Sequence, residues 1–329
     1  MDSTLQRSPR RPWRFPVYGL LAFVAGLPAA VAAESANAWL ERMASAVSNL
    51  TYRGTLVYVR HGQVDTLKIY HRVDETGMRE RLVALSGAPR EVLRDNDTVR
   101  CIFPERESVL VDTRIAERLF PTFPTDLNEL SSGSYEFALS GVDRVATHEA
   151  QVLSIAARDG LRYGYRLWLE RNTGMLLKSA LLDKKGNAIE QLLFTEIEIG
   201  ATISERELEP DVPSEGYVEI QLPRAPAVTP APGQDSWTLS KLPSGFQPVS
   251  RRRADGVVHF LFSDGLAAVS VYVEPVASGP KKPSGYSQIG AMNIYGQVSG
   301  GMAVTAVGEV PRPTLKMLVS SVTSATVQP

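Results

Sequence analysis

The side chains that could perform chemistry are few in this chain and lie far apart. No two of its histidines, His61, His71, His148 and His259, have the i, i+4 spacing with which one helix binds zinc. The segment Gly296-Gln297-Val298-Ser299-Gly300 resembles a nucleophile elbow but lacks the glycine two residues before its serine. Neither a phosphate-binding loop nor a dinucleotide fingerprint is present. We therefore predict no catalytic residue, no metal and no cofactor, and interpret the chain as a binding protein.

Cys101 is the only cysteine of the 329 residues, so an internal disulfide is excluded. It lies in the segment Val99-Arg100-Cys101-Ile102-Phe103, whose pattern is that of a strand. We expect it to be a small buried hydrophobic residue, and a reactive thiol or a link between molecules is the alternative.

Aromatic side chains are frequent in the segments with strand periodicity and could line an apolar cleft of the size of a lipid. The alternative is that they simply form the core. Two of them each precede a proline in Phe120-Pro121-Thr122-Phe123-Pro124, where a stiff loop could hold them at the mouth of the cleft. The candidate cleft residues are Tyr58, Tyr70, Phe120, Phe123, Phe137, Tyr163, Tyr165 and Trp168.

Basic side chains are in excess in the last third of the chain, where eight lysines and arginines oppose five acidic residues from Gln234 onwards. Such side chains could bind phosphates or an acidic peptide through charge-assisted hydrogen bonds. A solvated turn that only aids solubility is the alternative. The net charge of −1 for the whole chain argues against nucleic acid as a partner. The candidate partner-binding residues are Arg251, Arg252, Arg253, Lys281 and Lys282.

The first 33 residues have the order of a secretory signal peptide. Four arginines precede the apolar run Phe15 to Leu27, and small residues follow up to Ala33. An uncleaved membrane anchor is the alternative, but it needs about 20 apolar residues to span a bilayer. We predict cleavage near Ala32 or Ala33 and export of the protein.

The segments that must position these side chains are mostly strands. Ser35 to Leu50 has the apolar spacing of one helix, with Ser35 or Asn37 available as N-cap. From Thr51 to about Val111, apolar and polar residues alternate with period two, and turn residues separate the runs. This pattern predicts hairpins. Short helices are expected in the loop from Ile115 to Leu130. The three strands of an antiparallel meander are predicted at Leu161 to Leu169, Met175 to Leu182 and Gln191 to Ile199.

Six prolines in residues 209–233 favour an extended linker. Residues 34–208 would then form one large domain and residues 234–329 a smaller one. The smaller domain is expected to hold strands at Val257 to Phe262, Ala267 to Val273, Gln288 to Gln297 and Met302 to Glu309, and a closing helix from about Thr314 to Val322.

Ordered short motifs along nearly the whole mature chain resemble the RseB/MucB family of periplasmic regulators of the envelope-stress sigma factor. They include Gly54-Thr55-Leu56-Val57-Tyr58, Tyr70-His71-Arg72, Leu242-Pro243-Ser244-Gly245-Phe246 and Phe262-Ser263-Asp264-Gly265-Leu266. The resemblance implies an α+β fold: a large N-terminal unclosed antiparallel β-barrel with covering helices, like LolA and LolB, followed by a small C-terminal mixed α/β domain.

The same resemblance implies a periplasmic, non-enzymatic function. The protein would bind the periplasmic region of a single-span anti-sigma factor similar to RseA or MucA, protect it from site-1 proteolysis and so repress the sigma factor. Residues 34–208 would form the lipid-sensing domain, and lipopolysaccharide or the acyl chains of a mislocalised lipoprotein in its cleft would release the protein from the anti-sigma factor. The sequence leaves a homo-oligomer open. A periplasmic lipoprotein carrier or chaperone is the alternative function, and an exported hydrolase with an unrecognised site is a further one.

Overall fold

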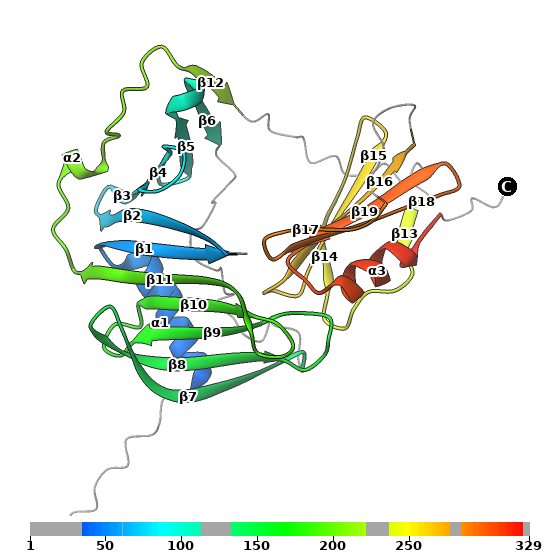
Figure 1. Cartoon of the computed structure of the whole chain (residues 1–329), viewed down its shortest axis with the longest axis horizontal. Helices are drawn as coiled ribbons and strands as arrows, with labels where there is room; N and C mark the ends of the chain where they lie inside the picture. Colours follow the sequence, from blue (N-terminus) through cyan, green and yellow to red (C-terminus); the bar gives the residue numbers. More distant parts are fainter. Residues whose placement is uncertain (1–34, 61, 113–132, 222–236, 277–283, 325–329) are drawn as a thin grey trace, which may run out of the picture. The chain divides into compact units, whose positions relative to one another are not determined.

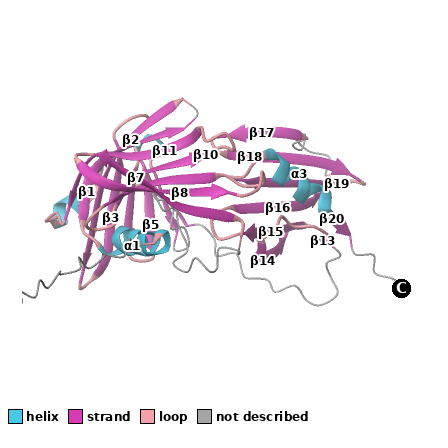
Figure 2. Ribbon diagram, turned by 90° about the horizontal axis from the view of Figure 1, so that it is seen from below, coloured by secondary structure: helices cyan, strands magenta, loops and turns pink. Residues whose placement is uncertain are grey.

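The computed structural model describes residues 35–60, 62–112, 133–221, 237–276 and 284–324 of the chain. The predicted signal peptide, the loop expected between Ile115 and Leu130 and the last part of the predicted linker lie outside these residues. Strands dominate the described chain, as Figure 2 shows. No helix among the described residues is long and apolar enough to cross a bilayer.

The first part of the chain folds into a twelve-stranded sheet with the order β12-β6-β5-β4-β3-β2-β1-β11-β10-β9-β8-β7 (Figure 1). All neighbouring strands are antiparallel except β12 and β6, and within the described residues the edge strands β7 and β12 do not pair with each other. The sheet is therefore open, as predicted. Its strands are β1 (Tyr52–Arg60), β2 (Gln63–Asp74), β3 (Gly77–Ala84), β4 (Glu91–Asp95), β5 (Thr98–Phe103), β6 (Ser108–Asp112), β7 (Tyr135–Val145), β8 (His148–Ala157), β9 (Gly164–Glu170), β10 (Leu176–Leu182), β11 (Ala188–Ile199) and β12 (Val218–Gln221).

Helix α1 (Ala36–Asn49) packs on one face of this sheet. Its start is fixed by Ser35, whose hydroxyl accepts a hydrogen bond from the backbone N–H of Ala38 at 3.2 Å, which confirms one of the two predicted caps. The apolar side of the helix joins the fully buried Leu56 and Leu167 in one core. We call the side of the sheet that carries Leu56 and Leu167 its core face.

The predicted meander is present as β9, β10 and β11, with boundaries within three residues of those expected. On β9, Leu167 and Leu169 are buried on one parity as predicted, but burial does not alternate at the end of the strand, because Trp168 and Glu170 are buried as well. Trp168, the exception to the pattern, is also buried, because it lies against Lys178 of the neighbouring strand and donates from Nε1 to Asp143 at 2.8 Å.

The opposite face of the sheet is covered in part by the chain after β11. There the one-turn helix α2 (Glu205–Leu208) contacts β3, and the apolar residues around it pack on Tyr70. Nearby, the buried Arg81 contacts the buried Glu91 at 2.9 Å and Asp211 at 2.6 Å. The described part of the predicted linker, residues 209–221, contains bends and a turn, in which the Tyr217 N–H donates to the carbonyl of Ser214 at 3.2 Å. Its proline-free part forms β12 beside β6.

The last part of the chain forms a six-stranded antiparallel sheet, in the order β14-β15-β16-β19-β18-β17, with α3 packed on it (Figure 1). The apolar residues of β15, β16 and α3 build its core. A short ladder of β13 and β20 lies outside this sheet. The elements are β13 (Trp237–Leu239), β14 (Gln247–Ala254), β15 (Val257–Ser263), β16 (Ala268–Pro275), β17 (Gly285–Ile289), β18 (Met292–Ser299), β19 (Met302–Gly308), α3 (Arg312–Ser321) and β20 (Val322–Ser324).

Two features of this second sheet differ from the predictions. The single strand expected from Gln288 to Gln297 is a hairpin, because Gly290 has φ +65° and turns the chain between β17 and β18. Strand β14 was not expected at all. Its three successive arginines interrupt the alternation of apolar and polar residues by which a strand is predicted. They nevertheless lie in regular register with β15.

The two sheets are joined by hydrogen bonds and one fully buried ion pair. Arg162 contacts Asp264 at 2.6 Å and also donates to the carbonyl of Ser244 at 2.6 Å. Tyr135 of β7 donates to the same carboxylate at 3.0 Å. A buried charge is tolerated only when it is paired and hydrogen-bonded, which Asp264 satisfies.

Candidate binding site

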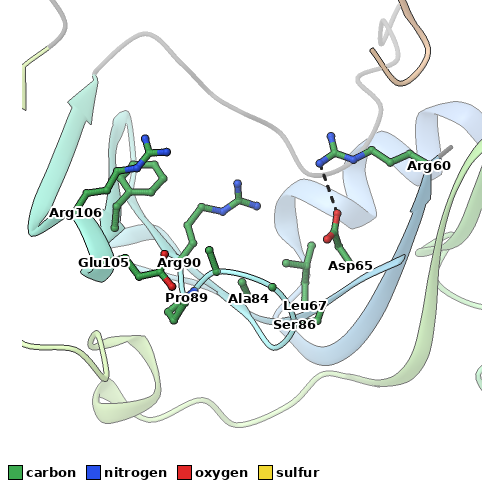
Figure 3. Close-up of a pocket in the computed structure, with 12 residues that line it drawn as sticks. Arg60, Asp65, Leu67, Ala84, Ser86, Pro89, Arg90, Glu105 and Arg106 are labelled. Atoms are coloured by element: carbon green, nitrogen blue, oxygen red, sulfur yellow. Dashed lines mark ion pairs between the residues drawn. The ribbon is translucent and has the colours of Figure 1, made fainter. Parts of the chain in front are cut away.

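A pocket opens at one end of strands β1 to β5, on the core face of the large sheet (Figure 3). Its volume of about 290 Å³ is at the low end of the range for small-molecule sites. Three arginines and two carboxylates line it together with small and apolar side chains. We call it the arginine pocket, and its lining residues are Arg60, Asp65, Leu67, Ala84, Ser86, Gly87, Ala88, Pro89, Arg90, Phe103, Glu105 and Arg106.

Strand register brings the apolar part of this lining together. Residues directly opposite each other in an antiparallel pair point to the same face. Leu56 of β1 is opposite Leu67 of β2, and Leu67 is opposite Ala84 of β3. Phe103, at the end of β5, has the parity that places it on the same face. The pocket floor is thus continuous with the core that α1 covers.

The loop between β3 and β4 is held by hydrogen bonds. The Ala84 N–H donates to the carbonyl of Arg90 at 2.9 Å, and the Leu85 N–H donates to that of Thr66 at 2.8 Å. Ser86 Oγ accepts from the Thr66 N–H at 2.8 Å, which leaves its own O–H to donate elsewhere. Arg90 is therefore presented from a fixed loop.

Arg106 is positioned by the tight turn between β5 and β6. The turn is a short 3-10 helix, Pro104–Arg106, followed by Glu107 in the left-handed region at φ 44°. The Arg106 guanidinium lies 6.0 Å from the centroid of the Phe103 ring. Figure 3 shows the side chains of Arg90 and Arg106 extending to the same side of the strand ends.

Positive charge exceeds negative charge in the pocket. Arg60 contacts Asp65 at 3.6 Å, and both side chains are well exposed to solvent. Within the described residues, Arg90 and Arg106 have no carboxylate at ion-pair distance, although Glu105 lines the same pocket. Two guanidinium groups are thus available to an anion that enters it.

Three of the predicted cleft residues, Tyr58, Phe137 and Tyr165, lie on the core face, half-buried at the margin of the core. Tyr58 donates to the carboxylate of Glu190, and burial together with this carboxylate raises its pKa. Burial also raises the pKa of Tyr165. All three pack against core residues, and none of them lines the arginine pocket.

The other predicted cleft residues are placed elsewhere, except that Trp168 belongs to the buried apolar cluster on which these three pack. Tyr70 and Trp168 have the opposite parity and lie on the other face of the sheet. Tyr163 precedes β9 and accepts a hydrogen bond from Asn293 of β18 at 2.9 Å. Phe120 and Phe123 lie outside the described residues.

The predicted basic cluster is divided between the two faces of the edge strand β14. Arg251 is opposite Phe260 and Arg253 is opposite Val258, whereas Arg252 is opposite His259 on the other face. The Arg251 guanidinium lies 5.2 Å from the centroid of the Phe260 ring and so covers part of the core. Lys281 and Lys282 lie outside the described residues.

The sequence-based prediction missed the arginine pocket. Arg60, Arg90 and Arg106 are single charged residues at strand ends and in turns, where charged residues are common. The one available signal was the segment Gly87-Ala88-Pro89-Arg90, which ends in a positive charge after residues typical of a fixed turn.

The described residues hold no group of three or more histidine, cysteine, aspartate or glutamate side chains that could bind a metal ion. The three described histidines serve separate contacts. His71 stacks on Tyr52, and His259 stacks on Tyr272. His148 lies 3.4 Å from the carbonyl of Ile197. Cys101 is half-buried in β5.

Comparison with known proteins gives matches along nearly the whole chain. The family model of the MucB/RseB N-terminal domain matches residues 35–212, and the family model of the MucB/RseB C-terminal domain matches residues 231–323. The sigma factor AlgU regulatory protein MucB of Pseudomonas aeruginosa is 35% identical over 314 residues, which cover 92% of this chain and 95% of that protein. The sigma-E factor regulatory protein RseB of Escherichia coli K12 is 27% identical and covers 93% of this chain and 95% of its own length.

Solved structures give the same result. The crystal structure of MucB in complex with MucA(peri) matches with a TM-score of 0.68 and 32% identity, over 89% of this chain and all of the solved chain (100%). The crystal structure of MucB matches with a TM-score of 0.60 and 32% identity, over 88% of this chain and 98% of that chain.

Proposed function

The chain belongs to the MucB/RseB family of sigma factor regulatory proteins, and we propose that it acts by binding the periplasmic region of a membrane anti-sigma factor similar to MucA or RseA. The observation that carries this proposal is the likeness, over 89% of the chain, to a protein solved in complex with MucA(peri). Because the match includes both sheets, each could contribute to the interface.

The protein would work by steric protection and would perform no catalysis. A bound anti-sigma segment is shielded from the site-1 protease, so the anti-sigma factor persists and the sigma factor stays repressed. Such a mechanism needs a stable complex and no reacting group. It operates in the periplasm, where the predicted signal peptide would direct the protein.

The exposed Arg252 and Arg253 of β14, together with Arg251 and the lysines Lys281 and Lys282, are the residues that we propose for the partner. An acidic anti-sigma segment would be attracted by these charges. Interactions of this kind act mainly on association and weaken as salt rises.

Release would follow from binding of lipopolysaccharide or of lipoprotein acyl chains to the large sheet. To move the protein almost completely from the partner-bound to the released state, a ligand must favour the released state by about 5.5 kcal/mol. Burial of roughly seven methylene groups supplies this free energy at about 0.8 kcal/mol each. One acyl chain is therefore long enough.

The proposal is tested with the purified protein and the periplasmic segment of MucA. Titration calorimetry should show binding, and the protein should slow cleavage of the segment by the site-1 protease. Absence of both effects would contradict the proposal. Binding of acyl chains without any affinity for the anti-sigma segment would favour a lipoprotein carrier instead.

The basic strand is tested by replacing Arg251, Arg252 and Arg253 with serine. Affinity for the segment should fall at low salt, and the difference from the unmodified protein should shrink as salt rises. A matched control replaces three exposed arginines with serine: Arg100 and Arg166 in the large sheet, and Arg158 just after β8. If the β14 variant binds as tightly as the unmodified protein at all salt concentrations, β14 is not part of the interface.

A further inference from the structure

We propose that the arginine pocket binds the phosphate headgroup of an amphiphile, with Arg90 and Arg106 holding the phosphate and the apolar floor holding the first part of the alkyl chain. This inference rests on the proposed function, because it assigns a place to the polar end of the releasing lipid. It goes further by naming residues that neither the aromatic cleft nor the basic strand includes.

Charge is the first support for a phosphate. Three guanidinium groups reach one pocket from three separate segments: the end of β1, the loop before β4 and the turn after β5. Arg60 already contacts Asp65, but Arg90 and Arg106 have no ion-pair partner among the described residues. Guanidinium groups bind phosphate through paired N–H donors, and two of them can hold one phosphate from two sides.

The apolar floor is the second support, and it distinguishes an amphiphile from a free anion. Leu67, Ala84 and Phe103 line the same pocket as the arginines. Leu67 is only 5% exposed and belongs to the core of the sheet. A free phosphate would gain nothing from these side chains, whereas an alkyl chain gains about 0.8 kcal/mol for each methylene group that it buries.

Size sets the limit of what enters. A volume of about 290 Å³ is near the smallest that small-molecule sites show, so a single headgroup fits but a whole lipid with several chains does not. A run of acidic peptide residues is also too large for this pocket. The rest of a lipid would therefore lie outside the arginine pocket.

The pocket is also preorganised. Three hydrogen bonds hold the loop from Leu85 to Arg90, and the hydroxyl of Ser86 keeps a donor for a phosphate oxygen. The backbone around Arg106 is fixed by the tight turn that ends at Glu107. Binding then orders few groups, which lowers its entropic cost.

The test uses the whole protein and four probes in titration calorimetry: hexyl phosphate, hexyl glucoside, inorganic phosphate and a short acidic peptide. Hexyl phosphate should bind at least tenfold more tightly than each of the other three. Equal binding of inorganic phosphate would overturn the assignment to an amphiphile, because the apolar floor would contribute nothing. Tighter binding of the acidic peptide would overturn the assignment to phosphate.

Variants then connect binding to the pocket. Arg90→Gln with Arg106→Gln should weaken hexyl phosphate binding at least tenfold. Arg90→Lys should keep part of the affinity, because lysine retains the charge but loses the paired donors. The matched control, Arg100→Gln with Arg166→Gln, removes two exposed arginines elsewhere on the sheet and should bind as the unmodified protein does. Equal weakening in the control would overturn the site, and unfolding curves of all variants exclude misfolding.

The test of the arginine pocket and the test of the proposed function can give different results. If the MucA segment binds but hexyl phosphate does not, the pocket assignment fails and the proposed function stands. If hexyl phosphate binds in a way that depends on Arg90 and Arg106 but the MucA segment does not bind, the pocket stands and the proposed function fails.

Discussion

The two ends of strands β1 to β4 carry polar side chains on the same core face, yet one end is a pocket and the other is closed. At the open end, Arg60, Asp65 and Arg90 line the arginine pocket. At the closed end, register places Tyr52, His71, Glu80 and Arg94 in one row across the four strands.

The polar groups of the closed end are involved in structure. Tyr52 is fully buried, and its ring stacks on that of His71 with centroids 4.7 Å apart. His71 Nδ1 lies 2.9 Å from the carbonyl of Leu50, just after α1, and burial lowers the pKa of this histidine. Burial raises the pKa of Glu80 to about 7, while the nearby Arg94 acts in the opposite direction.

The difference teaches that residue type does not distinguish a structural polar group from one that can bind a ligand. Arginine and a carboxylate occur at both ends. At the closed end they meet buried neighbours, whereas at the open end the side chains of Arg60 and Asp65 are 45% and 38% exposed. Substitutions should therefore cost stability at the closed end and ligand affinity at the open end.

The largest effect is expected for Tyr52→Ala. Removal of a fully buried aromatic side chain lowers the free energy of unfolding by about 3–5 kcal/mol. Urea denaturation followed by circular dichroism measures this loss. A loss below about 1 kcal/mol would show that the closed end is not a packed core, and the comparison of the two ends would fail.

Glu80→Gln should have an intermediate effect that depends on pH. The pKa of Glu80 is about 7 in the folded protein, above its ordinary value of 4.5, so the folded state holds this proton more tightly. Stability from this group is therefore greatest below pH 4.5 and falls as the pH rises to 7. With allowance for partial solvent access, the variant should be more stable by about 1–2 kcal/mol at pH 8 and unchanged at pH 4. Unfolding curves at the two pH values measure this difference, and a parallel shift at both would contradict it.

Phe103→Ala is the counterpart of Tyr52→Ala at the open end. Phe103 is only half-buried, so its removal should lower the free energy of unfolding by about 1 kcal/mol or less. Affinity for hexyl phosphate should fall several-fold, because the alkyl chain of the ligand loses part of the apolar floor on which it packs. Calorimetry and urea denaturation on the same sample measure both quantities. A large loss of stability with unchanged affinity would reverse the roles that we give to the two ends.

Arg90→Gln should have the smallest effect on stability, within about 0.5 kcal/mol, since Arg90 is exposed and has no ion-pair partner in the part of the chain that the structure describes. Its thermal unfolding midpoint should match that of the unmodified protein in the absence of ligand. Added hexyl phosphate should raise the midpoint of the unmodified protein more than that of the variant. An equal rise in both proteins would show that the ligand binds elsewhere.

Much of the fold could be predicted because its determinants are local. Alternation along β9 and the hydroxyl of Ser35 before α1 are read directly from neighbouring residues. Strand β14 was missed because its inward positions are arginines, whose alkyl parts replace apolar residues over Phe260.

The candidate site could be predicted only in part because it depends on register. Tyr58 and Tyr70 look equivalent in the sequence, but the pairing of β1 with β2 places them on opposite faces of the sheet. Arg90 and Arg106 lie sixteen positions apart and line one pocket only because β4 and β5 form a hairpin between them. Pattern within one strand gives the parity of a side chain, but not which parity faces the core or which loops meet.

Strand β14 has a further consequence for the behaviour of the protein at high concentration. It is an edge strand, and a free edge is the usual template on which a second copy of a chain adds and aggregation begins. Two copies that met at this edge would bring their rows of arginines together and repel each other. The same three charges that we propose for an acidic partner would thus keep the protein from self-association, and their removal should lower its solubility.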